Sequence, residues 1–362
     1  MTKSPVKTLG ILGGGQLGRM SAQAAEKLGI RTIIFTPETD SPAAQVSDQT
    51  IIADYNDHEA LQKFSGIVDV ISYEFENVPC ETVEYLEKLK PVYPDKTLLE
   101  VAQDRIKEKS FLNKIGIATA PWAEVKSVDD ITNTLEQWRT DACIIKTVRF
   151  GYDGKGQAFY NKDKDLNKIF DGFKGQPLIM EGVVDFECEI SIIIARDVNK
   201  DVAVYGPVLN EHKNHILDKT FAPAPIDAAL AQTARSMAVT LAEEVNLRGV
   251  LALELFVTRN GQILANEIAP RTHNSGHWTM DSCEYSQFDN HVRTVCGLPV
   301  GSARRHHDAE MINLIGDDVT NIAQYENNPD ARIHLYGKTE SRPGRKMGHV
   351  NILKPLSGLA DD

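Results

Sequence analysis

The sequence predicts an α/β protein that begins with a doubly wound parallel sheet and continues into a region rich in antiparallel strands. Three observations predict this class: strand-like and helix-like segments alternate over the first ninety residues, residues 141–205 are rich in strand-like runs, and Asn260-Gly261 joins two apolar runs. Strands that alternate with helices indicate a parallel sheet, and Asn-Gly between apolar runs is typical of a β-hairpin. With 362 residues, the chain is long enough for two or three domains.

The elements follow from hydrophobic periodicity along the chain. In the first part, we expect strands at residues 6–12, 31–35 and 67–73, and helices at residues 16–28, around Leu61 and at 81–89. The proline-containing stretch 90–95 then predicts a domain boundary. Beyond it, we expect a long polar helix over residues 96–115, a helix ending at Trp138, a strand through 144–146, a helix over 227–245, and strands at 311–315 and 332–336.

The charge balance and the cysteines limit the class of protein. The chain has 39 Lys and Arg residues against 51 Asp and Glu residues, which gives a net charge of −12. Such an acidic chain lacks the basic surface of a general nucleic-acid-binding protein. No apolar run approaches the ~18 residues of a membrane-spanning helix, so we expect no membrane contact. Five cysteines without a C-x-x-C pair indicate reduced thiols, and we therefore expect a cytoplasmic protein.

A glycine-rich loop follows the first predicted strand. Residues 13–18 read GGGQLG and fit the pattern G-x-G-x-x-G between a strand and a helix. Glycines let a phosphate approach the backbone closely, and the start of a helix offers N–H donors. One interpretation is the cofactor loop of an NAD(P)-dependent oxidoreductase. The other is a tight turn that binds a different ligand or none.

The predicted hairpin carries the most informative pair of residues. Apolar runs at residues 250–259 and 262–269 flank Asn260-Gly261, and a two-residue turn there places Glu254 directly opposite Glu267. Opposed like charges destabilise a sheet, and a shared divalent cation removes the repulsion. Carboxylate oxygens suit Mg²⁺, which commonly binds substrate phosphates as well. The alternatives are two solvent-exposed glutamates, or one carboxyl with a raised pKa.

Three further features are compatible with a phosphate-binding cleft. A second glycine-rich loop at residues 151–156 lies between strand-like segments, and Lys146 ends an apolar strand just before it. A basic stretch at residues 338–346 carries four cations and one acid in an otherwise acidic chain. Each feature also has a simpler interpretation: a surface turn, a lysine that reaches solvent, and a solvated loop.

A carboxylate pair on late strands, a lysine on an earlier strand and a glycine-rich flap together resemble an ATP-grasp enzyme. Five sequence blocks narrow the resemblance to the family of N5-carboxyaminoimidazole ribonucleotide synthetases. They are GGGQLGRM at 13–20, YEFENV at 73–78, GYDGKG at 151–156, NEIAPR through HNSGHW at 266–278, and RPGRKMGH at 342–349. The resemblance runs essentially end to end.

The resemblance implies a fold and a reaction. It implies a pre-ATP-grasp α/β domain at residues 1–95, an ATP-grasp region at 96–300 with a lid at about 118–183, and a small C-terminal domain at 301–362. The implied reaction joins bicarbonate to 5-aminoimidazole ribonucleotide at the expense of ATP, and gives N5-carboxyaminoimidazole ribonucleotide, ADP and phosphate through carboxyphosphate. It belongs to de novo purine biosynthesis. Mg²⁺ as cofactor and a homodimeric assembly are typical of the family.

The resemblance also assigns residues. It places ATP-binding positions at Arg105, Lys146, Gly151, Tyr152, Asp153, Gly154, Lys155, Gly156, Gln157, Glu181, Gly182, Val183, Val184, Glu189, His212, Asn266 and Glu267. It places contacts to 5-aminoimidazole ribonucleotide at Glu76, Tyr152, Asp153, Lys155, Lys338 and Arg345. It places the magnesium carboxylates at Glu254 and Glu267, in agreement with the hairpin.

Three residues are expected to act on the reacting groups. Lys146 and Arg271 are expected to stabilise the transferring phosphoryl group, and Asp153 to orient the substrate amine or accept its proton. One position departs from the family, which often has Arg where Lys155 stands, and Lys lacks the two-pronged guanidinium fork. A formate-dependent ribonucleotide transformylase of the same superfamily remains an alternative. The oxidoreductase is disfavoured, because the resemblance assigns the first glycine loop to the substrate side.

Overall fold

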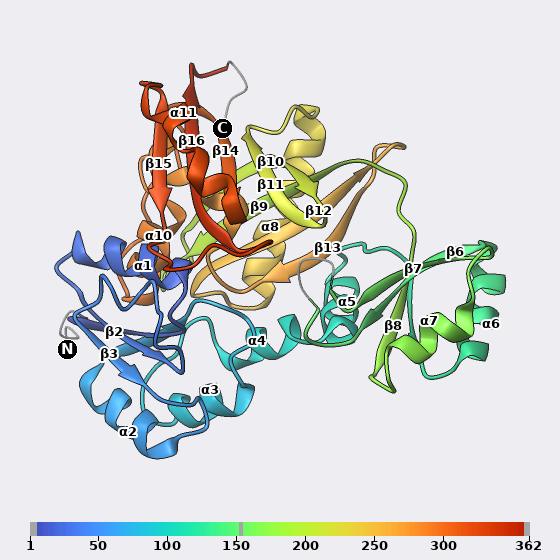
Figure 1. The fold of residues 1–362 in the computed structure, drawn as a ribbon, viewed down its shortest axis with the longest axis horizontal. Coiled ribbons are helices and arrows are strands. Elements are labelled where there is room, and N and C mark those ends of the chain that lie inside the picture. The colour runs from blue at the N-terminus through green and yellow to red at the C-terminus, as the bar shows by residue number, and fades with distance from the viewer. Residues whose placement is uncertain (1–5, 152–154, 358–362) are drawn as a thin grey trace.

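The computed structural model describes residues 6–151 and 155–357, which form three β-sheets (Figure 1). The strands are β1 Thr8–Leu12, β2 Arg31–Thr36, β3 Gln49–Ile52, β4 Val70–Tyr73, β5 Trp122–Val125, β6 Ala142–Thr147, β7 Gln157–Asn161, β8 Leu178–Gly182, β9 Phe186–Arg196, β10 Val202–Lys213, β11 Ile216–Ala222, β12 Gly249–Thr258, β13 Ile263–Ala269, β14 Asp308–Ile315, β15 Ala331–Leu335 and β16 Lys346–Lys354. The helices are α1 Gln16–Glu26, α2 His58–Ile67, α3 Cys80–Glu87, α4 Lys96–Ala102, α5 Arg105–Lys114, α6 Val128–Trp138, α7 Leu166–Gly172, α8 Ala228–Glu244, α9 Thr279–Ser282, α10 Gln287–Val295 and α11 Ala323–Glu326, with 3-10 turns η1 Asn274–Gly276 and η2 Gly316–Asn321.

The N-terminal sheet is parallel, with strand order β3-β2-β1-β4. Apolar side chains cover both of its faces. On one face, Met20 of α1 and Phe288 of α10 pack together, and on the other, Leu61 and Phe64 of α2 lie in a second cluster. This arrangement confirms the predicted doubly wound sheet. The strand expected over residues 67–73 begins only at Val70, because helix α2 continues through Ile67.

The central sheet is antiparallel and has the order β13-β12-β9-β10-β11-β14-β16-β15. The three C-terminal strands therefore extend the same sheet as the strands of the middle region. Apolar clusters lie on both faces of β9 and β12: Ile192 and Leu251 join α8 on one face, and Ile193 and Val250 join Trp278 on the other. Burial on both faces explains why these strands read as continuous apolar runs rather than as alternating ones.

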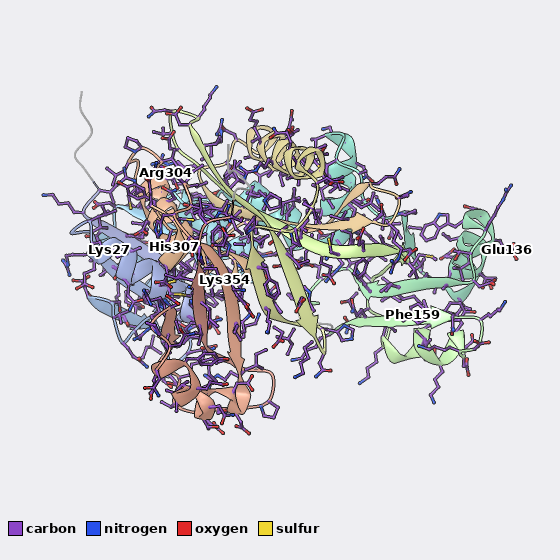
Figure 2. All side chains as sticks on the ribbon, turned by 90° about the horizontal axis from the view of Figure 1, so that it is seen from above. Lys27, Glu136, Phe159, Arg304, His307 and Lys354 are labelled. Atoms are coloured by element: carbon purple, nitrogen blue, oxygen red, sulfur yellow. The ribbon has the colours of Figure 1, made fainter. Side chains whose placement is uncertain are left out.

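The third sheet, β5-β8-β6-β7, carries helices α6 and α7, and together these elements are called the lid. The lid lies at the end of the molecule away from the N-terminal sheet (Figure 1). Seen from above, the labelled lid residues Glu136 and Phe159 stand far from Lys27 (Figure 2). Two short segments join the lid to the rest of the chain: residues 115–121 lead from α5 to β5, and residues 183–185 lead from β8 to β9 of the central sheet.

The long helix expected over residues 96–115 is wrong, because the chain forms two helices, α4 and α5. Asp104 separates them. Its side chain accepts hydrogen bonds from the backbone N–H groups of Ile106 and Lys107, which is the geometry of an N-cap. The polar pattern of the sequence continues through Asp104, so it does not reveal that this residue caps a new helix. None of the described helices is long and apolar enough to span a membrane.

Buried histidines make the stability of this fold sensitive to acid. His291 of α10 is buried, with Nε2 2.9 Å from the hydroxyl of Ser72, and burial lowers its pKa to about 4. An unfolded histidine has a pKa near ~6.5, so below that value only the unfolded chain takes up the proton. The stabilisation is complete above pH ~6.5 and is lost as the pH falls towards ~4.

We therefore expect His291→Asn to flatten the pH dependence of the free energy of unfolding between pH ~6.5 and ~4, by up to about 1.4 kcal/mol per pH unit. Urea denaturation at several pH values measures this slope. His307→Asn, at a solvent-exposed position, is the control and should leave the slope unchanged. An unchanged slope in His291→Asn would contradict the assignment.

Candidate active site

The β12–β13 hairpin brings Glu254 directly opposite Glu267, as the sequence predicts. The predicted two-residue turn is wrong, however. Near the turn Val257 pairs with Ile263, one position away from the predicted register. A β-bulge at Asn266 adds one residue to β13 and restores the predicted pairing at the two glutamates. The carboxylate pair therefore depends on the bulge and not on the turn.

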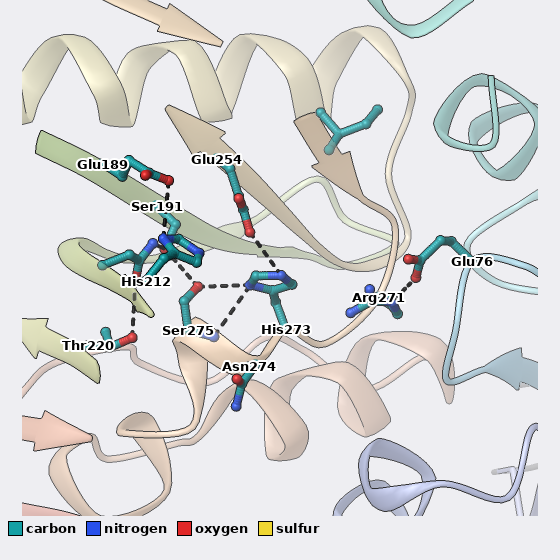
Figure 3. Close-up of polar contacts among 12 residues, drawn as sticks. Glu76, Glu189, Ser191, His212, Thr220, Glu254, Arg271, His273, Asn274 and Ser275 are labelled. Carbon is teal, nitrogen blue, oxygen red and sulfur yellow. Dashed lines mark hydrogen bonds and ion pairs between the residues drawn. The ribbon is translucent and has the colours of Figure 1, made fainter. Parts of the chain in front are cut away.

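The two carboxyl groups have different surroundings. Oε1 of Glu254 lies 3.1 Å from Nε2 of His273 (Figure 3). Burial acts to raise the pKa of Glu254, but the hydrogen bond and charge of His273 lower it overall. Glu267 is exposed to solvent on one side. Desolvation by the surrounding residues and the charge of Glu254 nevertheless raise its pKa to about 7. Two facing carboxylates with this mutual repulsion are a donor set that fits a hard divalent cation.

A buried group of charges joins the lid to α5. Oε2 of Glu181, on β8, lies 3.1 Å from Nζ of Lys146 on β6 and 3.2 Å from Nζ of Lys109 on α5. Burial acts to raise the pKa of Glu181, and the two lysines lower it overall. Oε1 of Glu181 is buried and has no hydrogen-bond partner among the described residues. Lys146 and Arg105 also act to lower the pKa of Glu267, so these cations lie near the carboxylate pair.

The end of β8 and the residues just after it carry the backbone groups that are expected to contact a nucleotide. Gly182 donates its backbone N–H to the carbonyl of Pro121 at 2.8 Å, and Val183 beyond it is half exposed, with Val184 next in the chain. On the central sheet, Oε2 of Glu189 lies 3.2 Å from Nδ1 of His212 (Figure 3). Burial acts to lower the pKa of His212, but Glu189 raises it overall.

Arg105 binds the N-terminal side of the second glycine loop. Its guanidinium donates to the carbonyl of Thr147 at 3.2 Å and to that of Gly151 at 3.1 Å. On the far side of the loop, Lys155 precedes Gly156, whose carbonyl accepts the N–H of Thr147, and Gln157 begins β7. The predicted site residues Tyr152, Asp153 and Gly154 lie outside the described residues.

The residues expected to bind the second substrate come from three distant segments. Arg271 forms an ion pair with Glu76, which follows β4 (Figure 3). Burial acts to raise the pKa of Glu76, but Arg271 lowers it to about 2. Lys338 donates to the carbonyl of Lys346 at 2.6 Å, and burial and Arg345 lower the pKa of Lys338 to about 8.

Arg345 reaches the N-terminal domain. Its guanidinium lies 3.7 Å from Oδ2 of Asp40, and Thr339 donates to the same carboxylate at 2.8 Å. The negative charges of Glu74 and Glu38 act on Lys338. The basic stretch 338–346 therefore lies against the N-terminal domain and beside its glycine loop.

The first glycine loop is satisfied within the protein. The carboxylate of Glu74 accepts hydrogen bonds from the backbone N–H groups of Gly15 and Gly18. A Cβ built at Gly13 or Gly15 would lie within 3 Å of the Glu74 side chain, which explains why these positions are glycine. The amides that would cradle a pyrophosphate in a dinucleotide-binding loop are thus already in use.

Several residues of the site were missed in the sequence. His273 contacts Glu254, and Glu74 fills the first glycine loop. Glu108 and Lys109 are buried on α5 beside β13, and burial raises the pKa of Glu108 to about 8. His273 could have been found from the sequence, because residues 270–278 contain many hydrogen-bond donors. No local signal marks Glu108 and Lys109, because they read as part of a polar helix.

The chain matches three family descriptions along its length. Residues 6–103 match the ribonucleotide synthetase pre-ATP-grasp domain, residues 110–288 the ATP-grasp domain, and residues 309–358 the phosphoribosylaminoimidazole carboxylase C-terminal domain. These matches confirm the predicted fold class. The N5-carboxyaminoimidazole ribonucleotide synthase of Brucella melitensis is 46% identical to the chain over 354 residues, which cover 97% of either sequence.

Solved structures agree with the sequence comparison. A crystal structure of an N5-carboxyaminoimidazole ribonucleotide synthetase in complex with ADP is 39% identical, has a TM-score of 0.93, and covers 98% of this chain and 94% of its own. A synthase from Aspergillus clavatus in complex with ADP and 5-aminoimidazole ribonucleotide is 29% identical, has a TM-score of 0.90, and covers 97% and 94%. The chain therefore belongs to the N5-carboxyaminoimidazole ribonucleotide synthase family of ATP-grasp enzymes.

Proposed function

We propose that Glu254 and Glu267 form the metal site at which this enzyme uses ATP to carboxylate 5-aminoimidazole ribonucleotide with bicarbonate. The chain is an ATP-dependent carbon–nitrogen ligase of purine biosynthesis, whose products are N5-carboxyaminoimidazole ribonucleotide, ADP and phosphate. The observation that carries the metal proposal is the pairing of two carboxylates on adjacent strands beside Lys146 and Arg105. Glu254 and Glu267 would hold Mg²⁺ there, and the ion would supply neutralisation of the negative charge of ATP during phosphoryl transfer.

ATP is proposed to lie between the lid and the central sheet. The backbone of residues 181–184, at the end of β8 and just after it, is proposed to bind the adenine, and Glu189 the ribose hydroxyls. His212 supports this role because it holds the Glu189 carboxylate in place. Lys146 and Arg105 lie near the carboxylate pair, where they attract the phosphate groups.

The remaining ATP-site assignments are the loop positions 151–157 and Asn266. The loop supports a role at the phosphates because Arg105 holds its base, next to Lys146. We propose that movement of the lid brings this loop over the site and excludes water, which would destroy carboxyphosphate.

The second substrate is proposed to bind where Arg271, Glu76, Lys338 and Arg345 converge. Lys338 and Arg345 are cations beside the N-terminal domain, and they suit the 5-phosphate of 5-aminoimidazole ribonucleotide. Arg271 is largely buried beside Glu76 and near Glu267, where it is proposed to stabilise the transferring phosphoryl group. Tyr152, Asp153 and Lys155 are proposed to contact the aminoimidazole, with Asp153 orienting the amine or accepting its proton.

The assembly, location and domain division are further proposals. We propose a homodimer, because the family resemblance implies one, and light scattering of the purified protein tests it. We propose a cytoplasmic location, supported by five cysteines that are all free thiols. The domain limits at residues 95 and 300 stay a prediction.

The activity is tested by measuring ADP release with each substrate supplied or omitted. We expect release that requires both bicarbonate and 5-aminoimidazole ribonucleotide, and formate should not replace bicarbonate. Release with formate alone would indicate the transformylase instead. Titration of nicotinamide fluorescence should show no binding of NADPH, because Glu74 occupies the loop amides.

A further inference from the structure

The bulge at Asn266 decides which residue of β13 faces Glu254. Between the turn and the bulge, Leu255 pairs with Ala265. If that register continued, Asn266 would lie opposite Glu254, and Glu267 would lie opposite Leu253. Residues opposite each other share one face of a sheet, so Glu267 would then point into the apolar cluster that contains Leu253. The extra residue therefore keeps the two glutamates on the same face.

The bulge lies on an edge strand, and elements outside the sheet hold it. β13 is the last strand of the central sheet, and just before the bulge its outer edge meets the segment after α5, where Ala265 donates its N–H to the carbonyl of Ala118 at 2.7 Å. The N–H of Ile268 donates to Oε1 of Glu108 at 2.7 Å, and the carbonyl of Asn266 accepts from Nζ of Lys109 at 3.3 Å. Adjacent residues of α5 thus bind the backbone on both sides of Glu267.

The burial of these two side chains is unusual for ionisable groups. Glu108 is 3% exposed and Lys109 is 1% exposed. Burying such groups is costly unless each one is hydrogen-bonded or paired. Lys109 is paired with Glu181, whereas the Glu108 carboxyl accepts a hydrogen bond from the N–H of Ile268 on β13. An apolar residue at position 108 would fill the same space on α5 but would leave the Ile268 N–H unsatisfied.

We propose that Glu108 is a positioning residue, which holds the Asn266 bulge through the Ile268 N–H and so keeps the Glu267 carboxylate opposite Glu254. Lys109 supports the same bulge from the neighbouring carbonyl. This inference rests on the proposed function, in which the two glutamates bind the metal. It adds a residue that contacts neither the metal nor a substrate.

The test compares Glu108→Leu with Glu108→Gln, because glutamine keeps an oxygen that accepts the Ile268 N–H and leucine does not. Mn²⁺ binding to the ADP complex is measured by electron paramagnetic resonance, without turnover. We expect Glu108→Leu to weaken Mn²⁺ binding at least about tenfold and Glu108→Gln less than about threefold. Both variants should bind ADP in EDTA like the unaltered protein, and the Ile268 amide should exchange hydrogen faster only in Glu108→Leu.

Glu267→Gln serves as the reference that separates this inference from the proposed function. If Glu267→Gln leaves Mn²⁺ affinity unchanged, the metal assignment and the inference both fail. If Glu267→Gln weakens binding but Glu108→Leu does not, only the positioning role is overturned. Should Glu108→Leu fail to fold, Glu108→Asn replaces it, since its shorter side chain withdraws the acceptor from Ile268. Equal Mn²⁺ affinity in Glu108→Asn and Glu108→Gln would then overturn the positioning role.

Discussion

Glu267→Gln is expected to lower kcat at least about 1,000-fold at saturating Mg²⁺, because metal stabilisation of the transferring charge is worth several kcal/mol. The substitution preserves the shape of the side chain and removes the negative charge that faces Glu254. ADP release in the presence of both substrates measures the effect. ADP binding in EDTA should stay within about twofold, since the adenine is proposed to bind other residues, at 181–184.

Glu244→Gln is the matched control for this prediction. Glu244 ends α8 at an exposed position, and it should keep the activity of the unaltered protein. Near-normal turnover of Glu267→Gln when Mg²⁺ is raised would contradict the role of this carboxylate as a metal ligand.

Arg345→Ala is expected to raise the KM for 5-aminoimidazole ribonucleotide about 10- to 100-fold, the cost of losing a charged hydrogen bond to a phosphate. The KM for ATP should change by less than about twofold, because Arg345 lies beside Asp40 of the N-terminal domain, whereas the adenine is proposed to bind at residues 181–184 of the lid. Initial rates with each substrate varied in turn measure both constants.

Arg342→Ala is the control for the second prediction, because Arg342 is largely exposed and pairs with Glu340 in the same loop. Its effect on both constants should be small. If Arg345→Ala raised both constants equally, Arg345 would not be a phosphate ligand of the second substrate.

The carboxylate pair could be predicted from the sequence, although for a partly wrong reason. Asn260-Gly261 predicted a hairpin and a register that joins Glu254 to Glu267. The structure reaches this pairing through a four-residue connection, residues 259–262, followed by a bulge at Asn266. The bulge could not be predicted, because the contacts that hold it come from α5, about 160 positions earlier in the chain.

In the fold as well, features set by neighbouring residues could be predicted from the sequence, whereas features set by particular contacts could not. The alternating elements of the N-terminal sheet follow from hydrophobic periodicity, which is a local property. The break between α4 and α5 depends on one side chain, Asp104, whose capping geometry the polar pattern conceals. The strand β16 was expected only as the end of a basic loop, because pairing with β14 and β15 sets its length.

The glycine loop at residues 13–18 shows why a motif needs its surroundings. Its spacing fits a dinucleotide-binding turn, and nothing nearby in the sequence contradicts that interpretation. In the folded chain, Glu74 comes from the end of a neighbouring parallel strand and accepts two of the loop's N–H groups. A carboxylate there excludes a pyrophosphate by charge as well as by space.

A crystal structure of the enzyme with Mg²⁺ and a non-hydrolysable ATP analogue tests the central claim most directly. We predict one metal ion that contacts carboxylate oxygens of both Glu254 and Glu267 and also oxygens of the triphosphate. A metal ion bound elsewhere, with the two carboxylates turned away from the phosphates, would contradict the proposed site.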